Sequence, residues 1–283
     1  MLARIVFSYY ALRFAKKSDL CGLKITAHKK MPALVLDIGN TRSKLGLFQN
    51  NTLVEQANWS AWTLQELTDY GNLCGVENVI VSSVAEPAAL LLEALQDQFR
   101  VLELTHQTPL PFRNDYRTPQ TLGKDRLAAV AGAQAAFPGQ NCLVVDCGTC
   151  IKYDLLLADG TYPGGNIAPG AGMRIKAMHH FTARLPEVTM TMPVDMTGYS
   201  TETALQNGAL RGAVLEIEGF ARLFRRQTNP LQVILTGGDA DFFYPFLDIQ
   251  YLIKDADLTL KGLNSILAFN TRNQKPCNKN TTL

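Results

Sequence analysis

The chain has 283 residues, of which 47% are hydrophobic and 18% are charged, and its formal net charge is +2. This balance is typical of a globular protein with a sizeable core, and the small net charge argues against a nucleic-acid partner or a polybasic membrane anchor. No stretch reaches the roughly 18 consecutive apolar residues of a spanning helix, so we expect no membrane segment.

The six cysteines do not follow the spacing of a disulfide framework, which favours a reducing compartment and a cytoplasmic location. Residues 1–30 precede the first clear strand, which opens after Met31. They are either an upstream misread start or an amphipathic or targeting arm. Residues 271–283 are polar, and we expect a disordered tail there.

A weak internal repeat relates residues 34–50 to residues 143–160, with Asp37 and Asp146 at matching positions. Each copy is an aliphatic run, an Asp-x-Gly turn and a second extended run, which predicts a β-hairpin. Two copies predict two similar domains.

The rest of the chain alternates predicted strands and helices. Before the second hairpin we expect strands at 76–84 and 101–105 and helices at 87–100 and 123–137. After it we expect a glycine-rich stretch at 164–172, helices at 173–185 and 201–227, and a strand, Gly-Gly turn and helix at 231–247. This order predicts an α/β protein with domains at 31–138 and 139–270.

Both Asp-x-Gly turns suit a nucleotide. Glycine lets backbone N–H groups approach a phosphate, and the aspartate can hold a cation or a bridging water. A third element, Thr236 to Ala240, places two glycines before a predicted helix, where an anion is favoured. Each turn alone is common in hairpins, but the three together indicate nucleotide binding.

The second turn also contains Cys147 and Cys150, three positions apart. A zinc site needs about four ligands, yet the sequence has no second C-x-x-C and His179 and His180 are adjacent. A redox pair favours a helix N-terminus rather than a hairpin. We therefore interpret both cysteines as packing residues.

The predicted helix at 123–137 opens with Gly123, Lys124, Asp125 and Arg126. An aspartate there can accept a hydroxyl proton, and an arginine can clamp a carboxylate or phosphate. The alternative is an aspartate that stabilises the helix dipole beside an exposed arginine.

These motifs, and their order along the chain, resemble those of type III pantothenate kinases. That family belongs to the superfamily of acetate kinase, sugar kinases, Hsp70 and actin. The resemblance covers about residues 33–270: the first hairpin, Tyr116 with 123–126, the second hairpin, 164–170, 201–208 and 236–240. It implies two actin-like (ribonuclease H-like) domains with a nucleotide cleft between them. It also implies ATP-dependent phosphorylation of pantothenate, the first step towards coenzyme A.

The resemblance implies residue roles as well. Asp125 is the expected base. Pantothenate would contact Tyr116, Gly123, Lys124, Asp125, Arg126 and Thr201. ATP would contact Asp37, Ile38, Gly39, Asn40, Thr41, Arg42, Ser43, Lys44, Thr149, Gly237 and Gly238. Asp37 would help hold Mg²⁺, and Asp146 would bind a monovalent cation, K⁺ or NH₄⁺. The family is dimeric, which implies a homodimer with Thr201 near the partner's pocket.

Lys152 departs from the family pattern, which often has a hydroxyl residue there, and its charge brings the strength of K⁺ dependence into question. Two other functions stay open. One is a nucleotide-binding accessory factor in transcription, and the other is a related kinase or phosphatase with another substrate, such as a sugar or polyphosphate.

Overall fold

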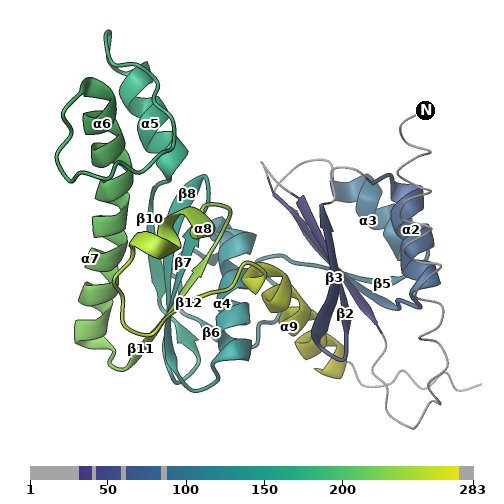
Figure 1. Cartoon of the computed structure of the whole chain (residues 1–283). Helices are drawn as coiled ribbons and strands as arrows, with labels where there is room; N and C mark the ends of the chain where they lie inside the picture. Colours follow the sequence, from purple (N-terminus) through teal and green to yellow (C-terminus); the bar gives the residue numbers. More distant parts are fainter. Residues whose placement is uncertain (1–31, 40–42, 59–61, 84–87, 274–283) are drawn as a thin grey trace, which may run out of the picture.

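A computed structural model describes residues 32–39, 43–58, 62–83 and 88–273, and Figure 1 shows them as two lobes. The expectations for residues 1–30 and 274–283 lie outside the described residues, as do those for Asn40, Thr41 and Arg42. Within the described ranges, no helix is both long and apolar enough to cross a membrane.

The first lobe is a mixed five-stranded sheet in the order β3-β2-β1-β4-β5. Its strands are β1 (Ala33–Ile38), β2 (Ser43–Gln49), β3 (Thr52–Asn58), β4 (Asn78–Ser83) and β5 (Arg100–Glu103). One face carries α2 (Leu64–Leu73) and α3 (Ala88–Gln96) (Figure 1). Thr63 and Glu66 form a capping box that fixes the start of α2.

The second lobe repeats this pattern with the order β10-β8-β7-β11-β12. Its strands are β7 (Asn141–Cys147), β8 (Cys150–Leu156), β10 (Gly164–Pro169), β11 (Leu231–Thr236) and β12 (Leu252–Lys254). In both lobes the first strand pairs antiparallel with the second and parallel with the fourth. The predicted fold class, two similar α/β domains of the actin-like kind, is confirmed.

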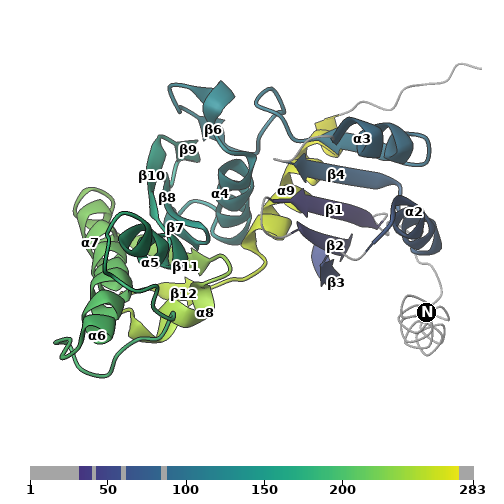
Figure 2. The same cartoon turned by 90° about the horizontal axis from the view of Figure 1, so that it is seen from above.

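Two helices lie between the sheets. α4 (Lys124–Ala136) packs on the second sheet, whereas α9 (Leu258–Asn273) packs on the first (Figure 2). They cross closely because Gly262 and Gly132 lack side chains: a Cβ at Gly262 would clash with the Ala128 carbonyl oxygen. The predicted domain boundary at residue 138 stays a prediction; it places α4 in the first domain and α9 in the second, whereas α4 contacts mainly the second sheet and α9 mainly the first.

Within the described residues, three apolar cores stabilise this arrangement. The largest lies between the two sheets and includes buried residues of α4 and α9. A second lies on the outer face of the second sheet beneath α5 (Ala171–His180) and α7 (Gly212–Gln227). A third lies on the outer face of the first sheet, beneath α2.

The connections refine several predictions. The predicted helix at 201–227 is α6 (Thr201–Gln206), a π-helical segment (Asn207–Arg211) and α7. The glycine-rich stretch forms β10, and α5 ends at His180 instead of residue 185. The helix after the Gly-Gly turn, α8 (Ala240–Phe243), is a single turn followed by a 3-10 turn (Tyr244–Phe246). Two short strands, β6 (Arg113–Asn114) and β9 (Thr161–Tyr162), pair beside the second sheet.

Candidate active site

Three aspartates from three separate elements approach one another where the lobes meet. Asp37 lies near the end of β1, Asp125 in the first turn of α4, and Asp146 near the end of β7. Lys152 joins two of them, because its Nζ lies 2.8 Å from Asp125 Oδ2 and 2.7 Å from Asp146 Oδ2. Asp37 lies close enough to both other carboxylates that their negative charges raise its pKa.

Strand register explains why these side chains gather. Asp37 is paired with Lys44 on β2 and with Ser82 on β4. In the second lobe Asp146 is paired with Lys152 on β8 and with Thr236 on β11. Each hairpin therefore places an aspartate between a lysine and a hydroxyl at the carboxyl ends of its parallel strands, where α/β proteins bind ligands.

The pKa of Asp37 is raised to about 6, first by burial and then by the charge of Asp125. Ser82, which hydrogen-bonds the carboxylate, and Lys44 both oppose this rise. Lys44 also donates a hydrogen bond of 3.1 Å to the carbonyl oxygen of Ala256, in the loop before α9. The site thus has an excess of negative charge that a divalent cation would relieve.

Lys152 remains charged in this setting. Burial alone would lower its pKa, but the carboxylates of Asp146 and Asp125 raise it above the ordinary value for lysine. Its side chain is only 19% exposed, so water screens the two ion pairs less than it would at an open surface. The ammonium group therefore neutralises part of the charge of both aspartates.

The start of α4 fixes the position of Asp125. Its Oδ1 accepts a hydrogen bond of 2.9 Å from the backbone N–H of Arg126. A Cβ at Gly123 would lie only 2.5 Å from that same oxygen, so glycine makes room for the carboxylate. With Lys152 on Oδ2, both carboxylate oxygens are held by the protein.

Arg126 is almost fully buried and is paired within the chain. Its Nη2 lies 2.6 Å from Asp154 Oδ1, which also accepts a hydrogen bond of 2.7 Å from the Tyr162 hydroxyl. Its guanidinium lies 5.4 Å from the centre of the Tyr116 ring, which stacks on Tyr162. The alternative of an exposed arginine is therefore wrong, and the role of Arg126 towards pantothenate stays a prediction.

Asp154 and Tyr162 were missed by the sequence reasoning, although one signal was present. Asp154 is a charged residue inside the apolar run of β8, and such a residue is almost always paired when buried. It lies two positions after Lys152, so both side chains point to the face of β8 that α4 covers. They contact Asp125 and Arg126, which are neighbours on α4.

The Gly-Gly turn lies directly against Asp146. Gly237 has a φ of +96°, and a Cβ there would clash with Asp146 Oδ1 and with the backbone of Cys147. The backbone N–H of Asp239 donates to the Cys147 carbonyl oxygen at 2.8 Å. Because α8 is a single turn, its dipole adds little, and the closeness of Gly237 to Asp146 is what favours a role for this turn. The role of Gly238 towards ATP stays a prediction.

The remaining predicted ligands lie in different places. Thr149 is exposed in the turn between β7 and β8, near Asp146. The Lys124 ammonium lies 3.4 Å from Glu103, at the end of β5. Thr201 begins α6, which lies beside α5 and away from α4 in both views (Figures 1 and 2). Within one chain, Thr201 is therefore not brought to Asp125.

The two cysteines of the second hairpin differ in environment. Cys147 is fully buried in the core of the second lobe, and burial raises the pKa of its thiol. Cys150 is partly exposed at the start of β8. A buried thiol with a raised pKa is a poor nucleophile and a poor metal ligand, which agrees with a packing role for Cys147.

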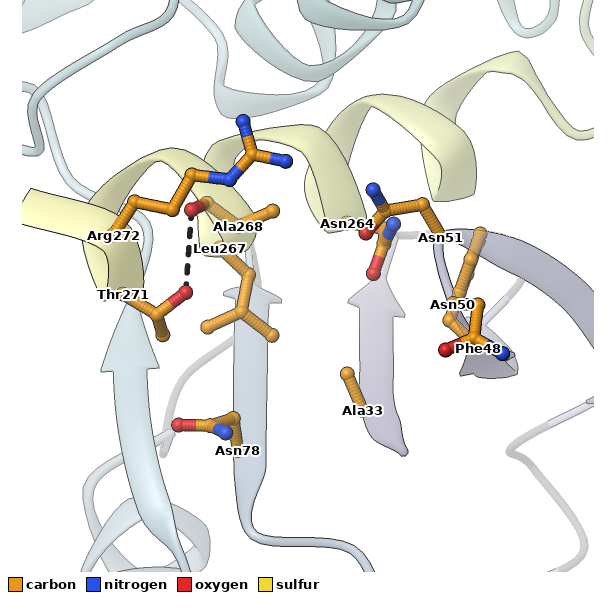
Figure 3. Close-up of a pocket in the computed structure, with 10 residues that line it drawn as sticks. All are labelled: Ala33, Phe48, Asn50, Asn51, Asn78, Asn264, Leu267, Ala268, Thr271 and Arg272. Atoms are coloured by element: carbon orange, nitrogen blue, oxygen red, sulfur yellow. Dashed lines mark hydrogen bonds between the residues drawn. The ribbon is translucent and has the colours of Figure 1, made fainter. Parts of the chain in front are cut away.

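A pocket lies at the other end of the first sheet, away from Asp37. Figure 3 shows its lining side chains, which come from the starts of β1 and β4, the end of β2, the β2–β3 turn and one side of α9. Its polar groups come from asparagines, a threonine and an arginine: Asn50, Asn51, Asn78, Asn264, Thr271 and Arg272. Because β1 begins at this pocket and ends near Asp37, the pocket is separate from the candidate active site.

Comparison with known proteins identifies one family. The family model for type III pantothenate kinase matches residues 33–223. A type III pantothenate kinase of Phocaeicola vulgatus is 42% identical over 240 residues, covering 84% of this chain and 99% of that protein. One from Christiangramia forsetii is 39% identical over 241 residues, covering 84% and 98%.

A solved structure shares the fold. It is a Campylobacter jejuni protein whose description assigns it to the Baf family of transcriptional activators. It covers 84% of this chain and 99% of its own, with a TM-score of 0.58 and 22% identity. At this identity the likeness concerns the fold alone.

Proposed function

Since the chain belongs to the type III pantothenate kinase family and is an ATP-dependent pantothenate kinase, we propose that Asp125 is its catalytic base. The reaction transfers the γ-phosphate of ATP to the hydroxyl of pantothenate and gives 4'-phosphopantothenate and ADP. The observation that supports this role is the position of Asp125, whose carboxylate is held on both oxygens beside Asp146 and near Asp37.

Asp125 would act by orienting the substrate hydroxyl and accepting its proton as the new P–O bond forms. Phosphoryl transfer depends mainly on positioning and charge stabilisation, so a fixed carboxylate within hydrogen-bond reach of the acceptor is the central requirement. Lys152 and the N–H of Arg126 limit the rotation of this carboxylate before the substrate arrives. That pre-organisation lowers the cost of reaching the reactive geometry.

The first hairpin would bind the phosphates of ATP. Asp37 and Lys44 are paired across its two strands, and Gly39 follows at the turn. Among the described residues no cluster of three or more His, Cys, Asp or Glu side chains has the geometry of a metal site. Mg²⁺ often binds proteins through one or two carboxylates together with substrate phosphates and waters, and Asp37 fits that pattern. Bound Mg²⁺ would neutralise charge on the phosphates.

Pantothenate would lie against the start of α4. We assign its contacts to Tyr116, Gly123, Lys124 and Arg126 together with Asp125. The Tyr116 ring is positioned by Tyr162 and by the guanidinium of Arg126. Because Asp154 already neutralises much of the Arg126 charge, Arg126 would help mainly by holding this wall of the pocket.

We also propose a homodimer that forms through the second lobe. Large apolar side chains are exposed on the segment just before α6, where Val194 is 97% exposed and Tyr199 82% exposed. Phe181 and Met196 add to this surface, and such groups of apolar residues often mark a protein interface. Dimerisation there would bring Thr201 close to the partner subunit and supply the contact with pantothenate that one chain lacks.

The dimer is tested by molar mass from light scattering. We expect a dimer for the unmodified protein and a monomer for Tyr199→Glu. Leu73→Glu is the matched control, because Leu73 is 75% exposed on α2 in the other lobe. A monomer for the unmodified protein at all concentrations would rule the dimer out.

A cytoplasmic location is proposed on two grounds. ATP is the phosphate donor, and the cysteines at positions 74, 142, 147 and 150 are free thiols in the described part of the chain.

Asp125→Asn tests the assignment of the base. ADP release from Mg²⁺ and ATP should depend on pantothenate in the unmodified protein and fall by at least about 100-fold in the variant. ATP binding, followed by calorimetry, should change little, because Asp125 contacts the acceptor side. Asp97→Asn, at an exposed position after α3, is the control and should keep full activity. Unchanged pantothenate-dependent turnover in Asp125→Asn would exclude Asp125 as the base.

A further inference from the structure

We propose that the Lys152 ammonium takes the place of a bound monovalent cation between Asp146 and Asp125, so that the enzyme needs neither K⁺ nor NH₄⁺. This inference rests on the proposed function and concerns the control of the same site. It makes Lys152 a positioning residue, because it acts on the reaction through the carboxylate of Asp125.

The contacts of Lys152 are the first ground. Its Nζ lies 2.7 Å from Asp146 and 2.8 Å from Asp125, within the range of strong charged hydrogen bonds. The two carboxylates come from different elements, β7 and α4, so the ammonium group ties the helix that carries the base to the sheet. A single positive charge between two carboxylates is what K⁺ or NH₄⁺ would provide.

The second ground is that the surroundings of Asp146 do not fit an additional cation. Asp146 Oδ2 is taken by Lys152, and Oδ1 faces the backbone of Gly237 so closely that no Cβ fits there. A potassium ion at Asp146 would lie within a few ångströms of the Lys152 ammonium, and like charges at that distance repel strongly. The expected monovalent-cation site at Asp146 is therefore already filled by the protein.

The first lobe provides an internal comparison. Lys44 occupies the equivalent register opposite Asp37, as Lys152 does opposite Asp146. The Lys44 ammonium, however, donates to the carbonyl oxygen of Ala256. A lysine at this register therefore does not bridge two carboxylates by default. The bridge in the second lobe depends on α4 bringing Asp125 over β8.

The test measures pantothenate-dependent ADP release in tetramethylammonium, K⁺ and NH₄⁺ buffers at equal ionic strength. The unmodified enzyme should vary by less than about twofold among the three. Lys152→Ser should lose at least about tenfold in kcat in tetramethylammonium, with KM for ATP little changed, because Asp125 Oδ2 is no longer held. K⁺ or NH₄⁺ should restore a large part of that loss. Lys152→Arg should stay independent of K⁺, since it retains the charge.

Thermal unfolding provides a readout other than activity. K⁺ should raise the melting temperature of Lys152→Ser and leave that of the unmodified protein unchanged, because only the variant has a vacated cation position. Lys254→Ser is the matched control: Lys254 also pairs with a carboxylate, Asp241, but at the edge strand β12. It should behave as the unmodified protein in all three salts.

The outcomes separate the two proposals. Stimulation of the unmodified enzyme by about tenfold or more in K⁺ would overturn the role of Lys152 while leaving the kinase assignment intact. If Lys152→Ser gave the same rate in every salt, that would also overturn it. If folded protein released no ADP in response to pantothenate in any salt, the proposed function itself would fail.

Discussion

The guanidinium of Arg126 and the carboxylate of Asp154 form a buried ion pair, with Nη2 and Oδ1 2.6 Å apart and side chains that are 4% and 2% exposed. The pair joins α4 to β8 directly behind Asp125 and Lys152. A buried charge that loses its partner is costly, so this pair is a sensitive point for stability.

Asp154→Asn should lower the free energy of unfolding by about 3–5 kcal/mol, because it leaves the Arg126 charge buried without a counter-charge. Urea unfolding followed by circular dichroism measures the change. Asp115→Asn is the control, since Asp115 pairs with Arg113 at the surface and should change stability by less than about 1 kcal/mol. Equal losses in the two variants would contradict the importance of burial here.

Gly123→Ala should reduce kcat by about 10- to 100-fold and leave the protein folded. The added methyl group would lie 2.5 Å from Asp125 Oδ1 and would push the carboxylate out of position, although the backbone at Gly123 suits alanine. Steady-state kinetics and a thermal melt measure the two effects. Gly219→Ala in α7 serves as a control, because its new Cβ meets no atom within 4 Å. A Gly123→Ala enzyme with normal kcat would show that this close approach does not position the base.

Gly237→Ala should destabilise the protein more than Gly75→Ala does. Both glycines have positive φ, +96° and +67°, so both substitutions strain the backbone by about 1–2 kcal/mol. Only at Gly237 would the new Cβ also clash, with Asp146 and the backbone of Cys147; nothing lies within 4 Å at Gly75. The difference in unfolding free energy between the two variants measures the cost of the clash alone. Calorimetry should show weaker ATP binding only for Gly237→Ala. Equal effects would argue against close packing at Asp146.

Asp37 should make stability depend on pH in Mg²⁺-free buffer. Its folded pKa of about 6 is above its ordinary value of 3.8, so the folded state binds the proton more tightly than the unfolded state. The resulting stabilisation is complete below about pH 4 and is lost as pH rises through 6. The Asp37→Asn side chain does not titrate. As pH rises from 4 to 7, the unfolding free energy of this variant should therefore increase relative to that of the unmodified protein by about 1–3 kcal/mol. A difference that stays constant over this range would contradict the raised pKa.

The sequence was most informative where local pattern determines structure. The two Asp-x-Gly hairpins, the strand at 231–236 and the helix that starts at Lys124 follow from periodicity and turn residues, and the structure confirms them. The exchange of α4 and α9 between the lobes was not predictable, because it depends on packing between glycines far apart in the chain. The grouping of Asp125, Asp146 and Lys152 needed the register of β7 and β8 together with the position of α4.

The partners of charged residues were the hardest part of the site to predict. Arg126 was expected to be either exposed or in contact with a ligand. Its ion pair with Asp154 could not be predicted, because it depends on how the chain folds in space. The signal for that pair was the presence of an aspartate within an apolar strand. Lys152 was recognised as a departure from the family pattern, but its contact with the proposed base depends on how α4 lies over β8.

The packing of α4 on one sheet and α9 on the other divides the reacting groups into two rigid sets. The second lobe carries Asp125, Lys152 and Asp146. The first lobe carries Asp37 and Lys44. Any hinge rotation about the α4–α9 crossing would change the distance between the phosphate-binding hairpin and the base, yet leave the base and its lysine in register. An opening of the lobes for nucleotide exchange would therefore leave the acceptor side of the site assembled.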